Sequence, residues 1–360
     1  MATGSMSKQW RVLISKSRDV YLNLAWEDWL YRRENFINQN MLLLWRNDPC
    51  VVIGRYQNPW KEVNVSSAKM LGISIARRFS GGGTVYHDLG NVNFTFLTER
   101  SLYNRRKNLE FIVDLLRKDY NVPATVNKRD DIVVNNSLKI SGTAAKLGRT
   151  TAYHHCTLLV SVIKDQLHAV LSAKNKGIRT NATESLPSPT VNLAEIVAGI
   201  ECETLIHGYA KSFAALNESF VDNVMVKEVT PTNVEYPGLS TVADDLRSTD
   251  FVFGKTPKFN IVREYLLPNE GADALRLLFD ILVDKGVVQG ANIEGNLHPS
   301  VMSALRSVCA QLDGIAYDSH LMWSVFEKSM LLSPFNEPPE GRIEMDFALR
   351  CLLRTVTCQE

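Results

Sequence analysis

Several features that would assign the chain to a special class are missing from its sequence. Its six cysteines form no C-x-x-C pair, which argues against a structural zinc site or a disulfide framework and favours a reducing compartment. No apolar run reaches the ~18 residues that a membrane helix needs, so we expect a soluble protein without a membrane partner. The 40 basic and 39 acidic residues nearly cancel, so bulk charge predicts no nucleic-acid partner.

A recognisable targeting segment is also lacking. Met1 to Ser7 have neither the apolar core of a secretory signal nor the arginine-rich amphipathic pattern of a transit peptide. This stretch is typical of an added leader in front of a truncated or mature start. Its lack of a signal therefore does not indicate the cytosol.

The chain does contain enough apolar material for a large core. Its 360 residues are 45% apolar and 22% charged, values typical of a globular protein that is long enough for two domains. Alternating runs predict strands, and runs with helical apolar spacing predict helices. We expect strands at 10–14, 41–45, 50–54, 73–78, 92–97, 132–134, 138–140 and 157–162, and helices at 20–36, 66–71, 108–120, 192–199 and 202–217.

Two pairs of these strands are expected to be hairpins. Turn-forming residues separate 41–45 from 50–54, and Asn135 to Ser137 separate 132–134 from 138–140. Hairpins interspersed with helices predict an α+β fold with a mixed or antiparallel sheet, and not a doubly wound fold.

The second half of the chain divides at two changes of composition. Polar residues and prolines dominate between Lys174 and Thr190, which predicts a mobile loop that is long enough to be functional. A junction at 253–259 leads to a small α/β domain, with strands expected at 261–266 and 287–293 and helices at 274–284, 300–312 and 322–331. We therefore divide the chain into a leader with the first strand at 1–18, a large domain at 19–250 and a C-terminal domain at 251–360.

The most informative stretch runs from Arg77 to Asn91 and reads RRFSGGGTVYHDLGN. Its three consecutive glycines lack a Cβ, so a ligand can approach the backbone and amide N–H groups can face an acidic group. Taken alone, the triplet favours a simple hairpin turn. A second glycine-bearing element, KISGTA at 139–144, is followed by YHHCTLL at 153–159. Two such elements in this order predict an anion-binding site.

These motifs resemble those of the lipoate-protein ligase A and lipoyltransferase family, most of all its eukaryotic mitochondrial lipoyltransferases. The likeness rests on R-R-x-S-G-G-G-x-V-x-H-D-x-G-N, K-x-S-G-x-A and H-H-x-T-L, and it is supported by N-L-A-x-E-D-W at 23–29 and I-G-R-x-Q-N-P-W at 53–60. It covers residues 20–259, and the C-terminal part matches only in size and position. The resemblance implies the catalytic fold of biotin and lipoate ligases for the large domain.

The resemblance also implies the reaction. Family members handle a lipoyl group, activated as a mixed anhydride with AMP or held on a donor protein, and attach it in amide linkage to a lysine. The chain is thus expected to take lipoyl from lipoyl-AMP or from lipoylated glycine-cleavage H protein and to pass it to lipoyl domains of 2-oxoacid dehydrogenase acyltransferase subunits. No tightly bound cofactor and a mitochondrial location are implied as well.

Lys139 is the expected catalytic residue, because a lysine beside a glycine-permitted turn can place its ammonium between carbonyl and phosphate oxygens. A lone lysine would be better explained as a solvated surface group, but its place in K-x-S-G-x-A favours catalysis. Arg78 and Arg129 are candidates for holding the phosphate or framing the acyl pocket, with surface ion pairing, to Asp130 or Asp131 for Arg129, as the alternative. The other expected lipoyl-AMP contacts are Ser80, Gly81, Gly82, Gly83, Tyr86, Asn91, Asp131, Thr157, Leu186 and Ser188.

The histidines predict no metal site. His154 and His155 are adjacent in a strand and point to opposite faces, and no third ligand is suitably spaced. One of them, or His87, is better explained as a core histidine that forms hydrogen bonds. Tyr86 fits a contact to the lipoyl chain or ribose and a core position equally well, and Thr157 either reaches the adenylate or packs as an ordinary β-branched residue.

Two departures from the family pattern bear on the activity. Cys156 stands where bacterial-type ligases usually have glycine, and the loop at 177–190 offers Leu186-Pro187-Ser188-Pro189 in place of an arginine-rich segment. A loop with few cations should hold pyrophosphate poorly. This favours a transferase over the alternative, an ATP-dependent lipoate-protein ligase that would need Mg²⁺.

Three further functions are disfavoured by single features. An octanoyltransferase would use a cysteine thioester, but Cys156 lies on the wrong element by resemblance. A biotin ligase has a different glycine-arginine loop. A non-catalytic lipoyl-binding protein would lack Lys139.

Overall fold

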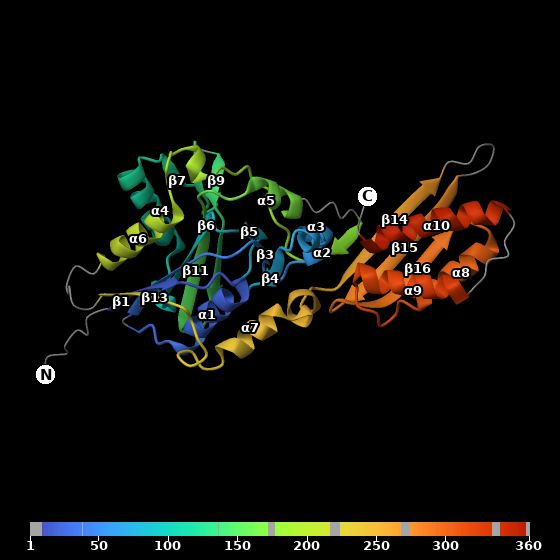
Figure 1. Cartoon of the computed structure of the whole chain (residues 1–360), viewed down its shortest axis with the longest axis horizontal. Helices are drawn as coiled ribbons and strands as arrows, with labels where there is room; N and C mark the ends of the chain where they lie inside the picture. The colour runs from blue at the N-terminus through green and yellow to red at the C-terminus, as the bar shows by residue number, and fades with distance from the viewer. Residues whose placement is uncertain are drawn as a thin grey trace. The chain divides into compact units, whose positions relative to one another are not determined.

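The computed structural model describes residues 9–37, 39–135, 137–171, 177–216, 224–267, 274–332 and 339–357. The expected leader at 1–7, Asn136 of the second hairpin and residues 174–176 of the expected loop lie outside these ranges. The chain forms two compact units (Figure 1). The first comprises Met1–Arg55, Leu71–Ala169 and Glu184–Ser248, and the second comprises Tyr56–Met70, Val170–Thr183 and Thr249–Glu360.

A mixed six-stranded sheet lies at the centre of the first unit, in the order β10-β11-β6-β2-β1-β13. Its strands are β1 (Gln9–Ser15), β2 (Gln39–Trp45), β6 (Asn91–Glu99), β10 (Thr143–Leu147), β11 (Thr151–Leu159) and β13 (Val224–Val229). β1 pairs in parallel with β2 and β13, and the other pairs are antiparallel. The predicted α+β class with a mixed sheet is confirmed.

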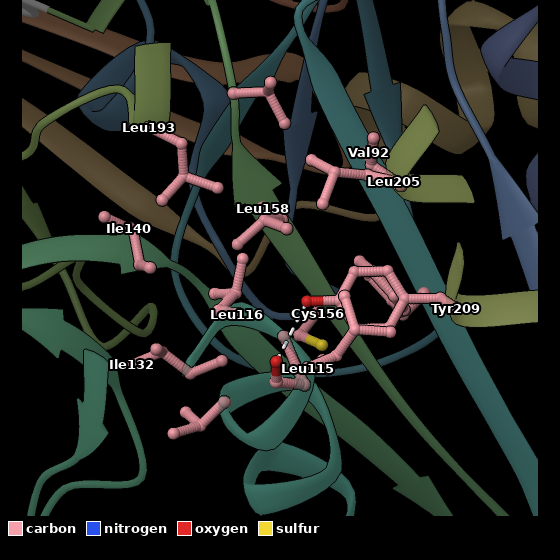
Figure 2. Close-up of a cluster of buried hydrophobic side chains, with 14 of the residues drawn as sticks. Val92, Leu115, Leu116, Ile132, Ile140, Cys156, Leu158, Leu193, Leu205 and Tyr209 are labelled. Carbon is pink, nitrogen blue, oxygen red and sulfur yellow. Dashed lines mark hydrogen bonds between the residues drawn. The ribbon is translucent and has the colours of Figure 1, made fainter. Parts of the chain in front are cut away.

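Helices of the first unit bury apolar side chains against this sheet. The N-cap of α1 (Val20–Arg33) is Asp19, whose carboxylate accepts two N–H groups of the first turn. α4 (Arg105–Tyr120) and α6 (Cys202–Ala214) contribute Leu116 and Tyr209 to a cluster around Cys156 and Leu158 of β11 (Figure 2). Burying a leucine side chain contributes about 1.5–3 kcal/mol. The many buried apolar side chains of this cluster therefore stabilise the first unit.

Two small sheets of the first unit hold the motif residues. In one, β3 (Cys50–Ile53) lies between β4 (Ser74–Arg77), its parallel partner, and β5 (Val85–His87), its antiparallel partner. In the other, β7 (Ala124–Val126), β8 (Ile132–Val134) and β9 (Leu138–Ser141) are antiparallel, which confirms the β8–β9 hairpin. The predicted pairing of 41–45 with 50–54 is wrong, because both edges of β2 are occupied by β1 and β6.

The second unit is built on an antiparallel four-stranded sheet in the order β12-β14-β15-β16. Trp60 packs its ring 5.1 to 5.3 Å from the rings of Phe253, Phe259 and Tyr317. This contact ties the segment 56–70 to the second unit. The second unit therefore includes residues that lie far before position 251 in the sequence. The elements of this unit are α2 (Pro59–Glu62), α3 (Val65–Met70), β12 (Ile178–Thr180), β14 (Phe259–Leu267), β15 (Leu275–Asp284), β16 (Val287–Gly295), α8 (Pro299–Ala310), α9 (Ser319–Leu332) and α10 (Pro339–Thr357).

Several element predictions differ from the structure. The helix expected at 274–284 is wrong, since β15 occupies it with buried and half-buried residues in alternation. The helix expected at 192–199 is a single 3-10 turn, Leu193–Glu195, and β12 lies inside the segment expected to be a loop. α5 (Lys164–Leu171) and α7 (Leu239–Arg247) are additional helices. Among helices in the described part of the chain, none is both long and apolar enough to span a bilayer.

Candidate active site

The segment from Ser80 to Gly83, called the glycine loop below, connects β4 to β5. Because β3 lies between these strands, the loop crosses the end of β3, and the hairpin alternative for the glycine triplet is wrong. Gly82 has φ of +83°, where glycine is favoured, and a Cβ there would lie 3.2 Å from Arg78 Nη2. A Cβ at Gly81 would meet nothing within 4 Å. The backbone of the loop is therefore approachable at Gly81.

Arg78 fixes the loop from inside. Its Nε donates to Ser80 Oγ at 3.0 Å, and its Nη1 donates to the Val52 carbonyl oxygen at 3.0 Å. Its Nη2 donates to the carbonyl oxygens of Gly81 at 2.6 Å and Gly83 at 2.7 Å. The side chain is buried, and burial lowers the pKa of Arg78 to about 10, so the guanidinium keeps its charge at neutral pH. All three guanidinium nitrogens of Arg78 thus donate hydrogen bonds to protein groups.

Ser80 is connected to two residues from distant parts of the chain. Its Oγ lies 2.8 Å from Nε2 of His155 in β11, and Nδ1 of His155 lies 2.9 Å from Oε1 of Glu27 in α1. Thr95 of β6 donates its hydroxyl to the same Glu27 oxygen at 2.7 Å. Burial opposes ionisation of Glu27, but His155 and these hydrogen bonds outweigh it and lower the pKa of Glu27.

The other two motif histidines are buried in neutral form. His154 lies next to His155 in β11 but faces the other side, where its Nε2 is 2.5 Å from Thr143 Oγ1. Burial lowers the pKa of both His87 and His154 to about 3. The opposite orientation of His154 and His155 is confirmed, and the described residues contain no group of three or more His, Cys, Asp or Glu that could hold a metal ion.

Lys139 lies in β9 and forms an ion pair with Asp131. Its Nζ is 2.6 Å from Asp131 Oδ1, and its side chain is 20% exposed. Asp131 is itself positioned by a turn, since its N–H donates to Asn127 Oδ1 at 3.0 Å. Arg129 lies 3.8 Å from the other Asp131 oxygen but is 57% exposed. The ammonium of Lys139 is thus held in one place while part of the side chain stays accessible.

Residues 184–190 connect the glycine loop with Lys139. At one end, Ser185 Oγ accepts the N–H of Thr84 at 2.8 Å. At the other end, the Lys139 N–H donates to the Pro189 carbonyl oxygen at 2.9 Å. This segment therefore borders both motifs.

Gly142 provides a second connection between the motifs. Its N–H donates to Thr157 Oγ1 at 2.8 Å, and its carbonyl oxygen accepts the Thr157 N–H at 2.9 Å. A Cβ on Gly142 would lie 3.3 Å from Val85 Cγ1. The absence of a side chain lets the end of β9 approach β5, which follows the glycine loop, and the Thr157 hydroxyl holds the backbone of Gly142.

The remaining expected site residues lie in different environments. Tyr86 is buried, its hydroxyl donates to Gln166 Oε1 at 2.7 Å, and burial raises its pKa. Asn91 is fully buried, and within the described residues its Oδ1 has no hydrogen-bond partner. Leu186 is 71% exposed, and Ser188 is half-buried.

Glu27, His155 and Ser185 are the residues of this region that the sequence did not single out. In the sequence, Glu27 stands out only as the glutamate of N-L-A-x-E-D-W, one of the stretches that support the family resemblance. His155 was recognised as part of a motif but without a partner, because its contacts are 75 and 128 residues away in the sequence. Ser185 has no local signal at all.

Cys156 lies in the apolar core. It belongs to the cluster with Leu116, Leu158 and Tyr209 (Figure 2). Burial raises its pKa to about 12, and a thiol that stays protonated at neutral pH is a poor nucleophile. A cysteine thioester at this position is therefore disfavoured by burial as well as by resemblance.

The α+β fold thus holds a clamped glycine loop and an ion-paired lysine within the first unit. The chain belongs to the lipoyl protein ligase A/B catalytic-domain family, which it matches over residues 19–214, and it is an acyltransferase.

Relatives and solved structures agree with this membership. The chain is 42% identical to human "Lipoyl amidotransferase LIPT1, mitochondrial" over 80% of this chain and 76% of that protein. The mouse protein of the same name is 43% identical over 72% of this chain and 70% of that one. The crystal structure of P. falciparum LipL1 in complex with lipoate is 29% identical, with a TM-score of 0.59 over 95% of this chain and 99% of that one. A lipoate-protein ligase A bound with ATP, 24% identical, has a TM-score of 0.52 over 68% of this chain and 96% of that one and shares the fold.

Proposed function

We propose that the chain moves a lipoyl group from lipoyl-AMP to a lysine of a lipoyl domain. Lipoyl transfer is the activity for which the human and mouse relatives are named. The observation that carries the chemistry is the Lys139 ammonium, held at 2.6 Å by Asp131 in a strand whose end packs beside β5 and the glycine loop. A fixed cation next to approachable backbone amides suits an acyl phosphate.

The reaction needs no protein nucleophile. The neutral amine of the acceptor lysine attacks the lipoyl carbonyl carbon, the bond from that carbon to the phosphate oxygen breaks, AMP leaves, and the amine proton passes to solvent. Negative charge develops on the carbonyl and phosphate oxygens during this step. Lys139 is placed to stabilise that charge, and the protein otherwise contributes position and orientation.

The other residues that were expected to contact lipoyl-AMP have different roles in this proposal. The Gly81 to Gly83 backbone faces the phosphate, and Asp131 fixes Lys139. Arg78 acts by holding the loop, because its fork is bonded to the loop carbonyls. Tyr86, Asn91 and Thr157 frame the acyl and nucleotide ends of the site, with Arg129, Leu186 and Ser188 at its exposed border.

Donor, acceptor and location complete the proposal. The donor is lipoyl-AMP or the lipoylated glycine-cleavage H protein. Lipoyl domains of 2-oxoacid dehydrogenase complexes are the acceptors, and the archaeal lipoylation system of one solved structure comprises a bipartite lipoate protein ligase and its E2 lipoyl domain. The names of both mammalian relatives support a mitochondrial location. ATP-dependent activation with Mg²⁺ is not required for this reaction.

A comparison of donors tests the proposal. Purified protein is incubated with an apo lipoyl domain and one of three donors: lipoyl-AMP, lipoylated H protein, or lipoate with ATP and Mg²⁺. Intact mass then reports the lipoyl group on the acceptor. We expect rapid modification from lipoyl-AMP and little from lipoate with ATP. Equally rapid lipoylation from lipoate and ATP would replace the transferase by a ligase that performs both steps.

A further inference from the structure

A continuous chain of buried hydrogen bonds runs from the large sheet to the glycine loop. Trp45 Nε1 donates to Thr95 Oγ1 at 3.1 Å, and Thr95 Oγ1 donates to Glu27 Oε1 at 2.7 Å. The same Glu27 oxygen lies 2.9 Å from Nδ1 of His155, whose Nε2 lies 2.8 Å from Ser80 Oγ. Trp45, Thr95, Glu27, His155 and Ser80 are all buried. The chain thus links β2, β6, α1 and β11 to the glycine loop, and the imidazole of His155 bridges Glu27 and Ser80.

The groups at the two ends of the chain can act only as hydrogen-bond donors. An indole N–H and a guanidinium N–H can only donate, so Thr95 Oγ1 accepts from Trp45, and Ser80 Oγ accepts from Arg78 Nε at 3.0 Å. Thr95 then donates its hydrogen to the Glu27 carboxylate, and the two ring nitrogens of His155 bridge Glu27 and Ser80. His155 Nδ1–H donates to Glu27. All five groups are satisfied, and the negative Glu27 is offset by the positive Arg78.

The order Ser80, His155 and Glu27 is that of a serine hydrolase triad, but Ser80 is not placed as a nucleophile. Ser80 is 1% exposed, and one lone pair of its hydroxyl oxygen already accepts from Arg78 Nε. Its carbonyl oxygen also accepts the N–H of Arg55 at 2.9 Å. Ser80 is therefore fixed at side chain and backbone, directly before the glycines that approach the substrate.

We infer that Glu27 and His155 are positioning residues for the transfer reaction, acting through Ser80 and Arg78 on the backbone of Gly81 to Gly83. The inference rests on the proposed function and extends it to residues outside the substrate contacts. A loop whose amides are fixed before the substrate binds needs no reorganisation when charge develops. If Glu27 is neutralised, His155 loses the charged partner that orients it, and the link of the loop to α1 and β6 is weakened.

A double-mutant cycle on the full chain tests this inference. The variants are Glu27→Gln, Ser80→Ala and the double variant, with kcat and KM measured for transfer from lipoyl-AMP to an apo lipoyl domain, per folded molecule by circular dichroism. We expect each single change to lower kcat roughly ten- to a hundredfold, with the KM for the lipoyl domain unchanged. The double variant should lose no more than the worse single one, since both changes break the same chain.

The neighbouring histidines provide a matched control. His155→Gln should reduce kcat like Glu27→Gln, whereas His154→Gln, one residue away on the opposite face, should leave kcat per folded molecule unchanged. Multiplicative losses in the double variant, equal losses at His154 and His155, or an acyl group trapped on Ser80 would each overturn the positioning role. Failure of the wild-type chain to transfer lipoyl would instead refute the proposed function, so the two failures are distinguishable.

Discussion

The two glycine-bearing motifs of this site are built in different ways. The glycine loop is held from inside by Arg78 and Ser80, which are 4% and 1% exposed and bonded to protein groups. The Lys139 motif lies at the end of a small antiparallel sheet, and the Lys139 side chain is 20% exposed and held by one ion pair. The first motif is rigid and internally satisfied, and the second presents a charge. This contrast suggests that one motif supplies geometry and the other supplies chemistry.

The largest effect is expected for Lys139→Ala. Removing the ammonium should lower the transfer rate roughly 10²- to 10³-fold, with little change in thermal stability, because the side chain is only partly buried. Steady-state transfer from lipoyl-AMP and a thermal melt measure the two quantities. Turnover near that of the wild type would remove Lys139 from the chemistry and end the contrast between the motifs.

Arg78→Lys should affect rate and stability together. A lysine cannot bond Ser80, the Val52 carbonyl oxygen and the loop carbonyl oxygens at once, as the three guanidinium nitrogens do, so buried polar groups lose their donors. We expect a cost of about 1–3 kcal/mol in the free energy of unfolding and a rate loss of roughly tenfold to a hundredfold from the misplaced loop. Chemical denaturation and kinetics on the same samples test this. A lower rate at full stability would show that Arg78 contacts the substrate directly.

Gly82→Ala is a milder test of the same loop. The added Cβ meets a positive φ of +83° and lies 3.2 Å from Arg78 Nη2. Such a change should cost about 1–2 kcal/mol of stability and slow transfer several-fold. Gly81→Ala is the matched comparison, because its Cβ would meet nothing within 4 Å. If both variants destabilise equally, Arg78 packing does not determine the loop conformation.

The smallest effect on rate is expected for Cys156→Ala. The thiol lies in the apolar cluster of Figure 2, so its removal should cost only about 1 kcal/mol of stability. Transfer per folded molecule should remain at the wild-type rate. Loss of transfer, together with an acyl-Cys156 adduct in the wild type, would revive the thioester mechanism and place the chemistry outside both motifs.

Structural features that depend on neighbouring residues could be predicted from the sequence, and features that depend on distant residues could not. The β8–β9 hairpin depends on neighbouring residues and was predicted. β15 was mistaken for a helix because Leu278 and Leu282, on its half-buried face, are apolar like the buried residues and hide the alternation. The partners of β2 are set by strands elsewhere in the chain, so the pairing with β3 was wrong.

The same distinction applies to the candidate site. Lys139, Asp131 and the glycine loop were found because their motifs are contiguous or nearly so. The link from Ser80 through His155 to Glu27 joins residues 75 and 128 positions apart, and neither spacing nor composition announces it. The sequence also does not predict which side chains are exposed. Arg78 and Lys139 are both cations in glycine-bearing motifs, but Arg78 is buried and the side chain of Lys139 is partly accessible.

The central claim is that the acyl group passes directly from lipoyl-AMP to an acceptor lysine. The most direct measurement is a rapid-quench single turnover with enzyme, lipoyl-AMP and an apo lipoyl domain, followed by intact mass of both proteins at each time. We predict that lipoyl appears on the domain lysine while the enzyme mass never changes. An acylated enzyme that forms and decays before the domain is modified would contradict the account.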